Sequence, residues 1–114
     1  SSGSVAALRG NQRHAAYAAS KGALLSYVRT RAIETARRGV TANYIAPGFV
    51  DTDMMSTYAK YRTVMEKQIP AGRFAQPQDI AALTAFLMSP GASYITGATL
   101  PVDGGLTAAI GIHR

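Results

Sequence analysis

The sequence contains no cysteine in its 114 residues. This excludes disulfide bonds and thiolate zinc sites, and it is compatible with a reducing compartment. No apolar run approaches the ~20 residues that a membrane-spanning helix needs, so no membrane partner is expected. A glycine-rich phosphate loop of the G-x-G-x-x-G pattern does not occur either.

Acidic side chains are scarce, with 6 against 12 basic ones and a net charge of +6. A nucleic-acid interface would gather the basic residues on one face or interleave them with aromatic residues. Here they are scattered, and only Arg37 and Arg38 are adjacent. The composition therefore does not favour a nucleic-acid partner.

Strand and helix patterns alternate along the chain, which predicts an α/β fold with a parallel sheet. The elements expected in order are a strand end at 1–5, a loop at 6–13, a helix at 15–38, a strand at 40–45, helices at 54–68 and 76–89, and a strand at 98–102. Pro101 inside the last strand indicates an edge position, since proline lacks an N–H.

The helix expected at 15–38 is apolar nearly all round in its first half, which predicts cover on more than one side. Gly39 is suited to end it as a left-handed cap. In the helix expected at 76–89, Pro77 suits the first turn and Asp79 the positive end. Its apolar residues recur at helical spacing, with Phe86 widening the stripe and Thr84 facing outward; they are Ile80, Leu83 and Leu87.

Tyr17 and Lys21 lie four residues apart, which places them on one face of a helix. A phenol has a pKa near ~10, and a neighbouring cation favours its ionised form, so the pair is a plausible acid/base device. Ser4 precedes Tyr17 by thirteen residues and can return to the same place from a strand end. Ser1 and Ser2 compete with Ser4 for this role, but the spacing favours Ser4.

The order of these residues and of several later blocks resembles the short-chain dehydrogenase/reductase family from residue 2 to about residue 106. Tyr-x-x-x-Lys alone occurs in many helices, and the ordered blocks make the resemblance specific. The blocks are Asn43-Tyr-Ile-Ala-Pro-Gly-Phe-Val-Asp-Thr52, Pro70-Ala-Gly-Arg-Phe74, Ala85-Phe-Leu87, Tyr94-Ile-Thr-Gly97 and Val102-Asp-Gly-Gly105.

The resemblance implies the C-terminal part of a doubly wound parallel sheet of the Rossmann type. We expect residues 1–114 to be the C-terminal half of one domain, with the N-terminal cofactor-binding half absent. The implied function is that of a cytoplasmic oxidoreductase dependent on NAD or NADP, which moves a hydride between the nicotinamide and a small carbonyl or secondary alcohol substrate. No metal is expected, because cofactor and tyrosine together supply the chemistry. Within the family the blocks look most like those of 3-oxoacyl-carrier-protein reductases and the sugar or alcohol dehydrogenases near them.

The resemblance also implies roles for single residues. Tyr17 is the acid/base, Lys21 binds the nicotinamide ribose and assists Tyr17, and Ser4 steadies the reacting oxygen. Cofactor contacts are implied at Tyr17, Lys21, Pro47, Gly48, Val50 and Thr52, with the backbone near Val50 holding the carboxamide. Substrate contacts are implied at Ala6, Met54 and Met55. The family's dimers and tetramers imply a homodimer or homotetramer through the 15–38 helix and the 76–102 helix and edge strand.

Several alternatives stay open from the residues themselves. Residues 47–52 could be only a strand-to-helix turn, and the methionines and tyrosines of 54–68 could be core rather than substrate lid. Asn43 is expected to be a structural hydrogen-bonding group, and Asp103 to precede a glycine turn rather than to bind a metal. A fragment or inactive relative that acts only through self-association is the alternative to an enzyme.

Overall fold

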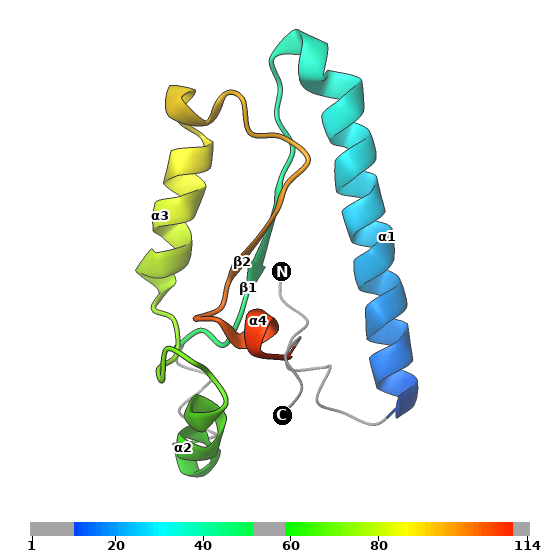
Figure 1. Ribbon diagram of the computed structural model, residues 1–114. Helices are drawn as coiled ribbons and strands as arrows, with labels where there is room; N and C mark the ends of the chain where they lie inside the picture. Colours follow the sequence, from blue (N-terminus) through cyan, green and yellow to red (C-terminus); the bar gives the residue numbers. More distant parts are fainter. Residues whose placement is uncertain (1–10, 52–58, 111–114) are drawn as a thin grey trace.

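The computed structural model describes residues 11–51 and 59–110, and its elements follow the alternating order of an α/β fold. Two four-residue strands, β1 and β2, pair in parallel. In Figure 1, α1 lies on one side of this pair and α3 on the other, while α2 and α4 lie near the carboxyl ends of the strands. The elements are α1 (Asn11–Thr35), η2 (Ala36–Arg38), β1 (Tyr44–Pro47), α2 (Ala59–Lys67), α3 (Pro77–Leu87), η4 (Pro90–Ala92), β2 (Thr99–Val102) and α4 (Leu106–Ile110).

The first helix begins at Asn11, four residues before the expected start. The chain after Gly10 carries no helix breaker, so good helix formers such as Gln12 and Arg13 extend it. The far end agrees with the expected cap. The last turn tightens into η2, and Gly39 adopts φ 76° and ψ 15° while its N–H donates to the Ala36 carbonyl at 3.0 Å. No helix in the described part of the chain is both long and apolar enough to cross a membrane.

One face of α1 is less exposed than the rest. From residue 15 onward, six positions are half-buried or buried and every other position as far as Thr35 is exposed; the six are Tyr17, Lys21, Leu25, Val28, Ala32 and Thr35. Their spacing of three and four residues follows the helical period. Ala32 and Thr35, each 3% exposed, fix the carboxyl end of this stripe to the rest of the chain.

The first strand lies later than the sequence predicts, at 44–47 instead of 40–45. The prediction was wrong for 40–43 because these residues bond irregularly to the chain before β2. The Ala42 N–H donates to Thr96 Oγ1 at 3.0 Å and the Ala42 carbonyl accepts from Gly97 at 2.7 Å. Val40 is 51% exposed, so it is not a buried strand residue.

Both strands contain a proline, and backbone alternation explains why the ladder tolerates each one. Tyr44 and Gly48 donate to the carbonyls of Ala98 and Val102 at 2.9 and 3.0 Å. Because successive residues face opposite sides, Pro47 and Pro101 direct their nitrogens away from the β1–β2 contact. The nitrogen of Pro101, which carries no hydrogen, therefore lies on the side of β2 turned away from β1. This agrees with the edge position expected for it.

The third long helix agrees with the sequence pattern in its start and its register. Pro77 occupies the first turn, and the Asp79 carboxylate accepts the Gln76 N–H at 2.7 Å. Phe86 departs from the expectation, because it is 47% exposed instead of widening the covered stripe. Thr84 is exposed as expected, and its hydroxyl donates to the Ile80 carbonyl at 3.0 Å.

The apolar core lies beyond the carboxyl end of β1. It consists of Phe49, Ile69 and Phe74, against which Met65 and Leu106 pack. The two phenylalanine rings stack with centroids 5.6 Å apart. Met65 of α2 therefore belongs to the core. For this residue of the 54–68 segment, the core interpretation holds and not that of a substrate lid.

Candidate cofactor and catalytic site

Tyr17 and Lys21 both lie on the covered stripe of α1 and are half-buried. The spacing therefore places the phenol and the ammonium on one helix face, and that face is directed toward the rest of the chain. In Figure 1 the N-terminal end of α1 lies at the same end of the molecule as the carboxyl ends of β1 and β2. Ligands of open parallel sheets bind outside those strand ends. Ser4 lies outside the described residues.

The loop after β1 begins with a backbone contact that only glycine permits. A Cβ on Gly48 would lie 2.8 Å from Cβ and 2.9 Å from Cα of Asp103. Gly48 is buried, and its N–H donates to the Val102 carbonyl. The segments that follow β1 and β2 therefore approach each other closely. The glycine predicted as a cofactor contact thus has a packing role of its own.

The backbone N–H and carbonyl of Val50 point away from Ala75, the residue with which this part of the chain pairs. The residues on either side of it pair with Ala75: the Phe49 carbonyl accepts from Ala75 at 2.8 Å, and the Asp51 N–H donates to Ala75 at 2.7 Å. In extended chain the groups of the middle residue point the opposite way. Neither the N–H nor the carbonyl of Val50 has a hydrogen-bond partner within 11–51 and 59–110.

One outward N–H and one outward carbonyl on the same residue match the acceptor and the donor of a primary carboxamide. The backbone at Val50 therefore fits the nicotinamide amide that the resemblance implies for this position. Pro47 and Gly48 lead into this residue from β1, so the strand sets its position.

Asp51, the next residue, is held by a fork of two hydrogen bonds. Arg62 of α2 donates from Nη1 to Oδ1 at 3.0 Å and from Nη2 to Oδ2 at 2.8 Å. Gln76 adds a longer bond to Oδ2 at 3.3 Å. The side-chain bond from Arg62 is the main reason that the pKa of Asp51 is below its ordinary value of 3.8, and the smaller effect of burial opposes it.

The guanidinium of Arg62 makes two further contacts. Its Nε donates to Glu66 at 3.2 Å, one turn along α2, and its central carbon lies 4.6 Å from the ring centroid of Phe74. The bonds to Asp51 and Glu66 raise the pKa of Arg62 further above its ordinary value. Sequence reasoning did not identify this cluster, because Asp51 and Arg62 are eleven residues apart and no local pattern joins them.

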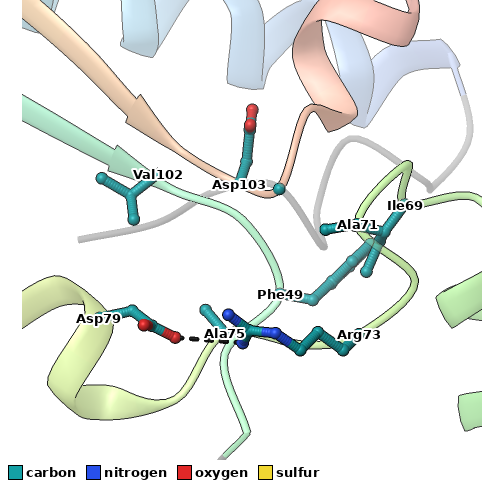
Figure 2. A pocket seen from close by; sticks show the side chains of 9 residues that line it. Phe49, Ile69, Ala71, Arg73, Ala75, Asp79, Val102 and Asp103 are labelled. Carbon is teal, nitrogen blue, oxygen red and sulfur yellow. Dashed lines mark hydrogen bonds and ion pairs between the residues drawn. The ribbon is translucent and has the colours of Figure 1, made fainter.

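A hollow of about 240 Å³ lies between the loop after β1, the 69–75 segment and α3. Figure 2 shows Arg73 and Asp79 joined across this hollow by an ion pair, whose length is 3.3 Å. The Asp103 carboxylate points away from that pair. Its lining contains neither Tyr17, Lys21 nor Val50, so it is separate from the predicted catalytic face.

The two remaining polar predictions concern structure and are confirmed. Asn43 donates from Nδ2 to the Ile95 carbonyl at 3.1 Å and accepts the Ala98 N–H at 3.0 Å. These bonds join the segments that precede β1 and β2. The Asp103 carboxylate accepts the N–H groups of Gly105 and Thr107, and Gly105 adopts φ 95°. Burial alone would raise the pKa of Asp103, but the bonds from Thr107 and the following backbone outweigh it and hold the pKa below 3.8.

Four of the predicted contact residues cannot be placed. Thr52, Ala6, Met54 and Met55 lie outside the described residues. In Figure 1 the N-terminal end of α1 and the carboxyl ends of the strands lie at the same end of the fold. The predicted substrate contacts stay predictions.

Comparison with known proteins identifies the family of the chain. The profile of a family described as enoyl-(acyl carrier protein) reductase matches residues 1–107. A 3-oxoacyl-[acyl-carrier-protein] reductase, FabG, of Vibrio cholerae is 48% identical over 105 residues, and the match covers 91% of this chain and 43% of that protein. FabG of Escherichia coli K12 is 46% identical with the same coverage.

Solved structures give the same result. A short-chain dehydrogenase family protein from Francisella tularensis superposes with a TM-score of 0.76 at 34% identity, over 94% of this chain and 49% of that one. YwfH, described as an NADPH-dependent reductase of bacilysin biosynthesis, gives 0.71 at 33% identity, over 75% of this chain and 37% of that one.

The chain belongs to the short-chain dehydrogenase/reductase family, and its two parallel strands and flanking helices are part of that family's Rossmann-type fold. Within the family it is similar to the 3-oxoacyl-[acyl-carrier-protein] reductases, and it spans 43% of the length of the first of them.

Proposed function

We propose that the protein carrying this chain is an NAD(P)-dependent oxidoreductase that reduces a ketone to a secondary alcohol. The observation that carries the proposal is the shared face of Tyr17 and Lys21 at the end of the fold where Val50 offers its backbone. The names of the relatives point to a 3-oxoacyl thioester on an acyl carrier protein as the first substrate to test. NADPH is the first cofactor to test, because a structural neighbour is described as NADPH-dependent.

When bound, the nicotinamide would supply hydride chemistry at the carbonyl carbon. The Tyr17 hydroxyl gives its proton to the carbonyl oxygen as negative charge develops there, and solvent returns a proton to the phenolate. Lys21, one helical turn away on the same face, holds the ribose. We assign the carboxamide to Val50, with Pro47, Gly48 and Thr52 as further cofactor contacts, and the reacting oxygen to Ser4.

We also propose that the protein assembles with copies of itself through the 15–38 and 76–102 regions, as a homodimer or homotetramer. Large apolar side chains remain exposed on both. Tyr27 and Ile33 of α1 are 63% and 79% exposed, and Met88 and Tyr94 after α3 are 82% and 101% exposed. Exposed apolar groups gathered on single elements are typical of contact surfaces.

The test uses the complete protein encoded by the full reading frame. We expect it to oxidise NADPH or NADH with a 3-oxoacyl thioester and not with the matching trans-2-enoyl thioester. Oxidation with the enoyl thioester alone would instead support the activity in the description of the family profile. Failure to bind or oxidise either cofactor would favour the alternative of a chain that acts only through self-association.

A further inference from the structure

The Arg62–Asp51 fork connects α2 to the residue that follows Val50. Asp51 is joined to the fold in two ways: its N–H bonds to Ala75, and its carboxylate is held by Arg62. The bond to Ala75 fixes the backbone N–H of Asp51, and the bonds from Arg62 fix its carboxylate. Together they leave the peptide on the Val50 side little freedom to rotate.

Arg62 is itself held in place from three directions. Glu66 accepts from its Nε, Asp51 accepts from both terminal nitrogens, and the Phe74 ring lies beneath the guanidinium. Phe74 is 1% exposed and belongs to the core. The planar guanidinium is therefore oriented before any ligand binds, which is what a positioning group requires.

A lysine could not reproduce this arrangement. Its ammonium is a single point charge and cannot hold both oxygens of Asp51 in a plane while it stacks on a ring. The pair is also only partly screened by solvent, with the side chains of Arg62 and Asp51 32% and 31% exposed.

We propose that Arg62 is a positioning residue that holds Asp51, and through it the Val50 peptide, in the orientation that binds the cofactor carboxamide. The inference rests on the proposed function, since it assigns the cofactor to the Val50 backbone. Arg62 contacts neither cofactor nor substrate in this proposal. Its effect falls on cofactor binding and not on the proton transfer at Tyr17.

The test is a titration of the complete protein with NADPH and with NADH, followed by the fluorescence of the reduced nicotinamide. Arg62→Met keeps an unbranched apolar stem over Phe74 and removes the donors, and Asp51→Asn removes the charge of the acceptor. We expect each to raise the dissociation constant about tenfold, as the loss of one charge-assisted interaction would. The double variant should be no weaker than either single one, because both remove the same interaction.

Two comparisons separate positioning from a general loss of structure. Arg62→Lys should recover little of the binding, whereas Lys67→Gln, which removes an exposed charge from the last turn of the same helix, should leave it unchanged. Saturating cofactor should restore kcat in Arg62→Met. If Arg62→Met lowers the melting temperature but binds cofactor within twofold of the unchanged protein, the inference is wrong. If the unchanged protein binds neither cofactor, the proposed function fails and the inference fails with it.

Discussion

Replacing Gly48 by alanine tests the close approach of the two strand ends. The added methyl would lie 2.8 Å from Cβ and 2.9 Å from Cα of Asp103. Contacts under 3 Å to backbone atoms cannot be relieved by rotating a side chain, so the two segments must separate. The bond of 3.0 Å from Gly48 to Val102 is strained as a result.

The expected cost follows from overpacking. Forcing one extra methyl into a packed site costs about 1–3 kcal/mol. In a protein of the relatives' size, 1 kcal/mol corresponds to about 2–4 °C in melting temperature. Gly48→Ala should therefore lower the melting temperature by about 2–12 °C.

Gly22→Ala is the matched control, because the residue is inside α1 and, apart from its own helical backbone and its two neighbours, no atom of the described residues lies within 4 Å of the added methyl. Alanine is better than glycine in a helix by about 1 kcal/mol, so this variant should be slightly more stable. Thermal unfolding of the complete protein, at one fixed concentration, measures both. Equal melting temperatures for the two variants would refute the close approach at Gly48.

Three further predictions concern the core, the helix cap and acid stability. Phe74→Ala should cost about 3–5 kcal/mol in denaturant unfolding, since the ring is 1% exposed and stacks on Phe49; a loss under about 1 kcal/mol would place the core elsewhere. Gly39→Ala should cost about 1 kcal/mol because φ is 76°, and an unchanged denaturation midpoint would contradict the left-handed cap. The pKa of Asp103 is lowered on folding, so its contribution to stability is present above pH 3.8 and is lost as the pH falls through the lower folded value; unfolding followed from pH 6 to pH 2 should show a smaller loss in Asp103→Asn, and identical profiles would contradict this.

The sequence predicts the parts of the fold that depend on local chemistry. Gly39 marks the end of the first helix because only glycine takes its backbone angles easily, and Pro77 marks the start of α3 because its fixed φ suits a first turn. Tyr17 and Lys21 share a face because spacing in a helix determines it. These features require no knowledge of the rest of the chain.

The features that the sequence does not predict depend on contacts between distant segments. Val40 has the pattern of a buried strand residue but is exposed, because the chain beside it bonds to the 95–98 segment. Arg62 looks like a solvated helix residue until the fold brings Asp51 to it. Phe86 is apolar at a helical spacing, and only tertiary structure decides whether that position is covered.

The most direct measurement of the central claim is the reduction rate of Tyr17→Phe in the complete protein, with NADPH oxidation by a 3-oxoacyl thioester as the assay. The proposal predicts a loss of about 10²–10⁴-fold in kcat, with a cofactor dissociation constant within about twofold of the unchanged protein because the ring and Lys21 remain. Substantial turnover in this variant, at a tenth of the original rate or more, would contradict the role given to Tyr17.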